Sequence, residues 1–419
     1  MGPGAPRMNA ANPADAQGQS FPARDPADPA VLRAWLGDVL LPYWRERTVD
    51  RAHGGFFERL TPEGALVPLD YKRMRLQGRQ IYLFSHAALI GLDPEGREVA
   101  ARGVDFVVRH GWAPGAGGFV FKLSLDGRRV LDATRHLYDQ AFVLFGLAWF
   151  HRLTGSAAAL AQADRTLAFL DARMRDPRAG GYLDAWIEGQ AGMPLPRRQN
   201  PHMHLVEALL ILAETSGRAD HLDRARALVE LFFARLRTGP HGFVTEYFTA
   251  DWRPAPGADG ARHEPGHHFE WIWLLLRYAR LAGDRELPGR LADLLEASLA
   301  RGIDRAPGML AATFDEIDPE GAPLVTTKRL WPQTETVKAL LAAYEAFGDA
   351  RHLQAAQATI RMIFRHYLPG GAPLFREHLD RGGGSCVVDF VPASSLYHLF
   401  LCLAEYLRVL GASPLEAQQ

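Results

Sequence analysis

The sequence of 419 residues lacks several features that mark whole classes of protein. It has two cysteines, Cys386 and Cys402, which are too few for a disulfide framework. Its formal net charge is -1, so nothing electrostatic favours nucleic acid or an anionic membrane as a partner. No apolar run approaches the roughly 20 residues that cross a bilayer. We therefore expect a soluble, cytoplasmic protein that binds neither nucleic acid nor membranes.

Motifs for cofactors, metals and activated serines are also missing. The glycine pairs are not followed by Gly-Lys-Ser/Thr, and no Gly-X-Ser-X-Gly elbow is present. His202-X-His204 and His267-His268 are potential metal ligands, but no His-Glu-X-X-His or cysteine-pair spacing accompanies them. We expect no cofactor and no metal, with a catalytic metal kept as the weaker alternative.

A glycine-rich turn recurs along the chain. The interval between successive turns is about 61 to 66 residues, through Gly55, Gly118, Gly181, Gly242, Gly308 and Gly371. A period of that length holds two helices and a hairpin, and it indicates a repeat that buries its apolar face against its neighbours. Several turns adjoin short alternating segments typical of strands, such as 119–123.

Between these turns the apolar spacing is helical, and Gly155 and Gly217 follow two of the helices as C-caps. Twelve helices are predicted, near 29–48, 71–91, 95–110, 135–153, 156–174, 199–216, 218–237, 265–282, 284–302, 330–347, 350–367 and 392–410. Six such pairs predict an all-α fold, an (α/α)6 barrel with short β-hairpins at its mouth. An open solenoid is the alternative. We expect one domain over 28–411, a disordered segment over 1–27 without the apolar core of a signal peptide, and a tail over 412–419.

Polar residues gather at the starts of four helices expected on the inner ring. Each helix begins near a proline, at 201, 265, 332 or 392, and Asn200 is a suitable N-cap for the first. Inner helices of a toroid run the same way, so their N-termini meet at one mouth. The polar residues there are His202, His204, Glu207, His267, His268, Glu270, Gln333, Glu335, Ser394, Ser395, Tyr397 and His398.

These side chains predict proton-transfer chemistry on a small sugar. The positive end of a helix dipole favours a neutral imidazole, which is what a general base needs near pH 7. We predict that His267 and His398 face the substrate from different sides, and that Glu270 orients His267. Trp331 suits the face of a pyranose, and Arg79 can hold hydroxyl groups through its guanidinium.

Six short motifs resemble those of the N-acylglucosamine 2-epimerase superfamily, which includes cellobiose 2-epimerases and mannose isomerases. Their order and spacing together are specific, and the resemblance covers nearly the whole chain after about residue 27. The motifs are Arg79-Gln80-Ile81-Tyr82, Tyr138-Asp139-Gln140-Ala141-Phe142, Asn200-Pro201-His202-Met203-His204-Leu205-Val206-Glu207, Pro265-Gly266-His267-His268-Phe269-Glu270, Trp331-Pro332-Gln333-Thr334-Glu335 and Leu396-Tyr397-His398.

The resemblance implies an (α/α)6 barrel and metal-independent chemistry at C2 of an aldose with a free reducing end. It implies that a proton leaves C2 to give a cis-enediol(ate), whose reprotonation yields the epimer at C2 or the ketose at C1. It assigns acid/base roles to His267 and His398. The sugar contacts that it implies are Arg79, Asn200, His204, Glu270 and Trp331. We add Glu335 as a further expected sugar contact.

The chain departs from the cellobiose epimerases, which often have Trp-Trp where it has Leu330-Trp331, and Lys-X-Pro-Tyr/Phe-His where it has 394–398. This favours a mannose-type monosaccharide, and we expect mannose–fructose isomerisation. A mannose-6-phosphate isomerase is the next candidate, with Arg197-Arg198 or Lys328-Arg329 binding phosphate. The sequence also leaves open an N-acylglucosamine or mannose 2-epimerase, a glycoside hydrolase on the same barrel and a non-catalytic sugar-binding protein. It is compatible with a monomer or a homodimer.

Overall fold

Alternate helices of the chain differ in how much of their surface is apolar, and this difference sorts them into two rings. Helix α5, Leu137–Thr154, buries almost every residue from Leu137 to Trp149, as a helix that is apolar all round must. Helix α12, Ala350–His366, buries only the stripe Ala356, Ile360, Ile363 and Phe364. The first kind forms an inner ring and the second kind covers it.

The computed structural model describes residues 24–190 and 196–411, and it has the barrel that the sequence predicts. The inner helices are α3 (Met74–Leu89), α5, α7 (Gln199–Ser216), α9 (Pro265–Ala282), α11 (Leu330–Phe347) and α13 (Ala393–Val409). The outer layer consists of α1 (Pro29–Trp35), η2 (Leu36–Leu40) and α2 (Leu41–Thr48), α4 (Gly96–Phe106) with η3 (Val107–Gly111), α6 (Ala157–Phe169) with η4 (Leu170–Met174), α8 (Ala219–Leu231) with η5 (Phe232–Leu236), η6 (Leu287–Leu291) with α10 (Ala292–Arg301), and α12.

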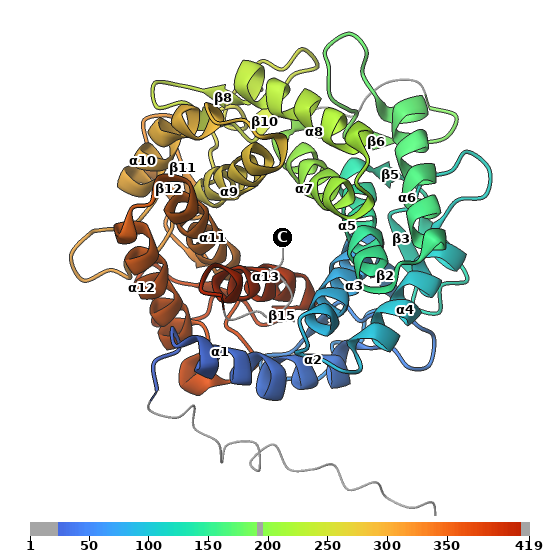
Figure 1. Cartoon of the computed structure of the whole chain (residues 1–419), viewed down its shortest axis with the longest axis horizontal. Coiled ribbons are helices and arrows are strands. Elements are labelled where there is room, and N and C mark those ends of the chain that lie inside the picture. Colours follow the sequence, from blue (N-terminus) through green and yellow to red (C-terminus); the bar gives the residue numbers. More distant parts are fainter. Residues whose placement is uncertain (1–23, 191–195, 412–419) are drawn as a thin grey trace, which may run out of the picture.

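The ring closes on itself, because α13 packs against α3 and α1 packs against α13 (Figure 1). Trp35 and Trp44 donate their indole N–H groups to the backbone of residues 371 and 373. The hydroxyl of Tyr406 donates to the carbonyl of Ala27, which is buried. Residues 24–27 are therefore part of the fold, which corrects the expected boundary of the disordered segment. The rest of that segment and the tail over 412–419 lie outside the described residues.

Short antiparallel strands lead into five of the six inner helices. The pairs are β2 (Tyr71–Arg73) with β3 (Lys122–Ser124), which also pairs with β4 (Val130–Asp132), β5 (Arg135–His136) with β6 (Ala185–Trp186), β7 (Arg197–Arg198) with β10 (Tyr247–Phe248), β13 (Lys328–Arg329) with β14 (His378–Leu379), and β15 (Val391–Pro392) with β1 (Arg59–Leu60). Two further hairpins are β8 (Arg237–Thr238) with β9 (Phe243–Val244) and β11 (Glu316–Ile317) with β12 (Pro323–Val325). The β1–β15 pair connects a segment before the first inner helix to the start of the last inner helix and so helps to close the ring.

Helices α7, α9 and α11 have the predicted bounds, whereas α3 and α5 begin later than predicted because strands β2 and β5 precede them. Gly155, Gly217, Gly283 and Gly348 adopt the left-handed conformation after α5, α7, α9 and α11. The expectation that Asn200 caps α7 is wrong. Arg198, at the end of β7, is the capping residue, and Asn200 lies inside the first turn. No helix within the described ranges is long and apolar enough to cross a bilayer.

Candidate active site

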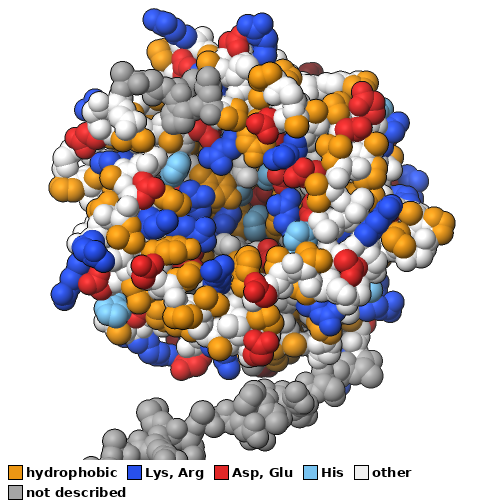
Figure 2. All heavy atoms as spheres, turned by 180° about the vertical axis from the view of Figure 1, so that it is seen from behind, with side chains coloured by type: hydrophobic (Ala, Val, Ile, Leu, Met, Phe, Trp, Pro, Cys, Tyr) orange, Lys and Arg blue, Asp and Glu red, His pale blue; other side chains and the backbone are white. Residues whose placement is uncertain are grey.

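A pocket of about 270 Å³ lies at the end of the ring where the inner helices begin. Figure 2 shows a central hollow on the rear face, with Lys and Arg side chains around it and His side chains within it. The residues that line the pocket are Arg79, Tyr138, Asn200, His204, Glu264, His267, Glu270, Arg329, Trp331, Glu377, Pro392, Ser394, Ser395 and His398. The structure therefore brings seven of the eight site residues expected from the sequence to one pocket.

The ring symmetry explains which side chains reach the pocket. The second residue of an inner helix and the residue four places later share one face, and this face points to the barrel axis. Pocket-lining residues at these positions are Arg79 of α3, Tyr138 of α5, Asn200 and His204 of α7, Glu270 of α9, Trp331 of α11, and Ser394 and His398 of α13. Glu335 holds the corresponding place on α11 but does not line the pocket.

His267 is held between two polar partners. Its Nδ1 lies 2.9 Å from Oε1 of Glu246, and its Nε2 lies 3.1 Å from the side-chain amide of Asn200. The expected partner Glu270 makes no hydrogen bond to it in the part of the chain that the structure describes. The expectation that Glu270 orients His267 is therefore wrong, because Glu246 reaches the ring from the loop between β9 and β10.

The protonation state expected for His267 is also corrected. Burial disfavours the charged ring, but the carboxylates of Glu246 and Glu264 outweigh it and raise the pKa of His267 to about 9. The Asn200 atom that lies 3.1 Å from Nε2 is the amide nitrogen Nδ2. A charged imidazole donates from both nitrogens, so it pairs with Asn200 only when the amide is turned to present its oxygen instead. His267 is thus arranged as a proton donor at neutral pH.

His398 has the opposite character. Its Nδ1 lies 2.8 Å from Oε1 of Glu335, which fixes the tautomer whose Nε2 carries a lone pair. Burial, with Arg79 and Lys338 as nearby positive charges, lowers the pKa of His398 well below its usual value. Lys338 contacts Oε2 of Glu335 at 2.6 Å and has no exposed side-chain surface. His398 is therefore neutral, and its ring is oriented by a buried carboxylate that contacts a buried lysine.

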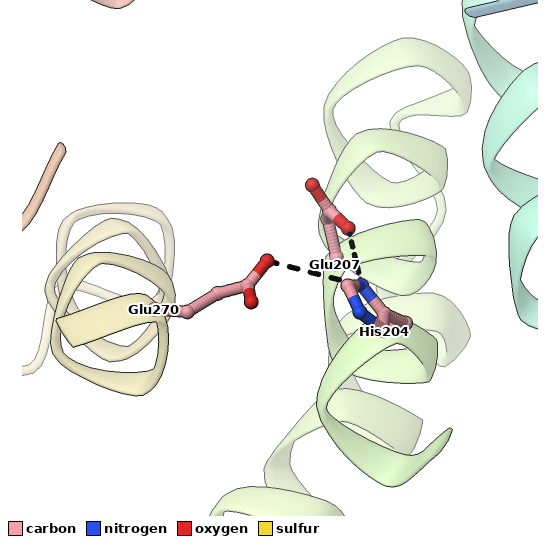
Figure 3. Close-up of side chains that lie close together, drawn as sticks. All are labelled: His204, Glu207 and Glu270. Carbon is pink, nitrogen blue, oxygen red and sulfur yellow. Dashed lines mark hydrogen bonds and ion pairs between the residues drawn. The ribbon is translucent and has the colours of Figure 1, made fainter. Parts of the chain in front are cut away.

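Three carboxyl groups, those of Glu335, Glu270 and Glu207, act on this buried lysine, and Glu270 also lines the pocket. Nζ of Lys338 lies 3.9 Å from Oε1 of Glu270, whose pKa is raised well above normal by burial and by the charge of Glu335. Figure 3 shows Glu270 extending from α9 toward His204 on α7, where Nδ1 lies 4.0 Å away and is bound by Glu207 at 3.0 Å. Glu207 also accepts a hydrogen bond from the hydroxyl of Tyr397. Glu270 is thus the carboxyl group of this cluster most readily protonated.

Two histidines that the sequence offered as metal ligands have structural positions. Nε2 of His202 accepts a hydrogen bond from the backbone N–H of Tyr182 in the adjoining hairpin, at 3.0 Å. His268 stacks on the ring of Phe243, with the centroids 4.8 Å apart. In three other repeats a glutamine holds the position of His202. Its side-chain oxygen accepts a hydrogen bond from a backbone N–H of the adjoining hairpin at 2.8 Å; the glutamines are Gln77, Gln140 and Gln333. His202 therefore supports the fold and faces away from the pocket.

Most of the basic residues considered for phosphate binding form ion pairs with carboxylates of the protein. Arg197 and Lys328 are buried and bind Asp176 and Asp304. Arg329 lines the pocket, but it is paired with Asp315 and Glu264. Arg79 also lines the pocket and donates to the hydroxyl of Tyr138 at 2.7 Å.

Trp331 lies close to both catalytic candidates. Its ring centroid lies 4.8 Å from that of His267 and 5.7 Å from that of His398. Sequence reasoning missed Glu246, Glu264 and Glu377, which lie outside the inner helices. The glycine turn at 241–243 adjoins Glu246 and was the available signal, but its side-chain direction depends on how the hairpin packs.

Three groups in the described part of the chain have the spacing of a metal site, and all lie around this pocket. They are His204, Glu207 and Glu270; Glu246, Glu264 and His267; and Glu270, Glu335 and His398. In each group the histidine Nδ1 is 2.8 to 3.0 Å from one carboxylate oxygen, as in an ordinary hydrogen bond. The donor set therefore fits histidine–carboxylate pairs that tune proton affinity.

Comparison with known proteins adds a family to this geometry. The sequence profile of N-acylglucosamine 2-epimerase (GlcNAc 2-epimerase) matches residues 55–402. The chain belongs to the N-acylglucosamine 2-epimerase family. A mannose-6-phosphate isomerase from Rhizobium meliloti is 33% identical over 385 residues, which cover 89% of this chain and 95% of that protein. A cellobiose 2-epimerase from Bacteroides fragilis is 28% identical, with 78% and 84% covered.

Solved structures of this family share the barrel. A cellobiose 2-epimerase from Spirochaeta thermophila superposes with a TM-score of 0.80 at 26% identity, covering 92% of this chain and 96% of that one. A D-mannose isomerase superposes with a TM-score of 0.82 at 22% identity, covering 91% and 98%. An α-mannanase of glycoside hydrolase family 76 has a TM-score of 0.66 at 13% identity, a likeness of fold alone. The chain is therefore a sugar isomerase or epimerase, as the sequence predicts.

Proposed function

We propose that this member of the N-acylglucosamine 2-epimerase family interconverts mannose and fructose. The observation that carries the proposal is the pair of histidines that both lie close to Trp331, one neutral and one charged. A pocket of about 270 Å³ is below the size range of drug-sized ligand sites, and it suits a single hexose. The name of the D-mannose isomerase with the same fold supports this substrate.

In the proposed reaction, Nε2 of His398 removes the proton from C2 of the open-chain aldose. His267 donates its proton to O1 as electron density moves from the C2–H bond toward the carbonyl, and an enediol results. His398 then returns its proton to C1, while the proton on O2 passes to His267. Every atom is conserved, and both histidines regain their initial states. Arg79 and neutral Glu270 offer donors to the oxygens on which charge develops.

Phosphorylated mannose is the second candidate substrate, because the relative with 33% identity is named for it. Epimerisation at C2 is the second candidate reaction. Charged His267 would then return a proton to the face of C2 opposite His398, and both rings lie close to the same indole. Both candidates use the same pocket and the same first proton transfer.

One experiment separates these reactions and substrates. The protein is incubated in deuterium oxide with mannose or with mannose 6-phosphate, with and without a chelator, and products are followed by NMR. Fructose formed from mannose in the presence of chelator supports the proposal. Glucose with deuterium at C2 indicates epimerisation, and turnover confined to the phosphorylated sugar indicates the second substrate. No exchange of the C2 hydrogen of either sugar refutes the proposal.

Variants test the histidine roles directly. We expect His267→Ala and His398→Ala each to lower kcat by at least about a hundredfold, the range of general acid/base catalysis. His352→Ala on the outer helix α12 is the matched control and should retain activity. Wild-type turnover in both pocket variants contradicts the mechanism.

A further inference from the structure

Glu377 presents an unused polar atom to the pocket. It precedes β14 and lines the pocket beside Ser395 and His398. The hydroxyl of Ser395 donates to its Oε1 at 2.9 Å, whereas its buried Oε2 has no hydrogen-bond partner among the described residues. Buried polar atoms in proteins are nearly always hydrogen-bonded, and an unpaired one is costly. This oxygen therefore needs a partner that the described residues do not supply.

The position of this carboxyl group is set by the fold on two sides. The carbonyl of Glu377 accepts a hydrogen bond from the N–H of Leu330 at 2.9 Å, at the start of α11. The next two residues pair with β13 in the register Lys328↔Leu379 and Arg329↔His378. Ser395, in the first turn of α13, holds the other end of the side chain. Glu377 is thus preorganised at the junction of two inner helices, ready for a ligand.

Two acidic groups near the pocket have close partners of opposite charge, whereas Glu270 has no hydrogen bond among the described residues and lies 3.9 Å from Lys338. Glu264 binds Arg329 and Glu335 binds Lys338, so their charge is compensated within the protein. Glu377 has no ion pair among the residues that the structure describes, and burial raises its pKa to about 8. Near neutral pH its carboxyl group can donate one hydrogen bond and accept others. A sugar hydroxyl is the matching chemical group, since it also donates and accepts.

We propose that Glu377 is a sugar-binding residue, with Oε2 hydrogen-bonded to a hydroxyl group of the bound aldose. Its hydrogen-bond donor and acceptor match an uncharged hydroxyl group at this edge of the pocket. This inference rests on the proposed function only in placing a sugar in the pocket. It assigns Glu377 to binding and leaves proton transfer to the two histidines.

The test compares Glu377→Ala and Glu377→Gln with the wild type and with Glu296→Gln, a control on the exposed side of α10. KM and kcat are measured for mannose, and Kd is measured calorimetrically for mannitol, which has hydroxyl groups but no reacting carbonyl. We expect Glu377→Ala to raise KM and the mannitol Kd by about tenfold, with kcat changed by less than about threefold. Glu377→Gln keeps a donor and an acceptor, so we expect a smaller rise.

Three results overturn the inference: an unchanged mannitol Kd in Glu377→Ala, a loss confined to kcat, or equal losses in the Gln and Ala variants. Thermal unfolding of each variant checks that the fold is retained, and the Gln variant keeps the volume of the side chain if the Ala variant does not fold. A wild type that binds mannitol but does not turn over mannose contradicts the proposed function instead. In that case the mannitol Kd of Glu377→Ala still decides the role of Glu377.

Discussion

Replacing Glu246 by Gln tests whether His267 is the charged partner. The substitution keeps the shape of the side chain and removes the carboxylate that lies 2.9 Å from Nδ1. The pKa of about 9 for His267 exceeds the ordinary value of 6.5, a difference worth about 3 kcal/mol. An opposite charge at this distance shifts a pKa by about 1 to 3, so we expect the pKa of His267 to fall by that amount.

The sign of the stability effect follows from the same shift. His267 has a higher pKa in the folded state than in the unfolded state. It therefore contributes its full stabilisation below about pH 6.5, where the ring is protonated in both states. That contribution is lost as the pH rises from about 6.5 through about 9. We therefore expect wild-type stability to decline over this window, and Glu246→Gln to show a weaker decline.

The assay combines NMR titration of the imidazole with the pH dependence of kcat/KM and of urea unfolding. The His267→Ala variant identifies the His267 signal, and His352→Ala again serves as the control. A wild-type His267 that titrates at or below 6.5 would falsify the assignment of this ring as the acid. An unchanged titration in Glu246→Gln would show that Glu246 does not govern it.

Three further substitutions test the packing beneath and around the site. Lys338→Met leaves Glu335 without a counter-charge and should cost about 3–5 kcal/mol of unfolding free energy, whereas the double variant with Glu335→Leu should recover stability but not activity. His202→Ala should cost about 1–3 kcal/mol in urea unfolding, and His202→Gln should restore it, since glutamine fills this place in three other repeats. Gly78→Ala should lower the melting temperature, with a loss of about 1–3 kcal/mol or more, because its Cβ would lie 2.2 Å from the carbonyl oxygen of Phe142. If Lys338→Met unfolds like the wild type, the ion pair with Glu335 does not stabilise the fold. If His202→Gln is no more stable than His202→Ala, the hairpin hydrogen bond is not what His202 contributes. If Gly78→Ala is as stable as the wild type, the close approach to Phe142 does not constrain residue 78.

The helical repeat could be predicted from the sequence because its signals are local. Gly155 and Gly217 end helices by adopting positive φ, a property of the residue type. Continuous apolar helices such as α5 must be buried, and the regular interval between turns makes them equivalent. The polar residues that begin the inner helices then meet at one mouth, because equivalent helices run in the same direction.

The protonation states and hydrogen-bond partners of those residues could not be predicted in the same way. The helix N-terminus suggested a neutral His267, but two carboxylates from loops between repeats make it a cation. Glu335, expected at the sugar, lies beneath His398 and orients it. Both outcomes depend on contacts between segments far apart in the sequence.

The amino-acid order by itself determined the repeat of helix pairs, their sorting into a buried ring and a covering layer, and the pocket face on most of the inner helices. Hydrophobic periodicity and turn-forming residues act over a few neighbouring positions, so they can be recognised in the sequence alone. Only the tertiary structure decided which acid faces which histidine and which polar atom of Glu377 has no partner among the described residues. Proton affinities depend on burial and on charges a few ångströms away, and distances of that kind exist only after the ring has closed.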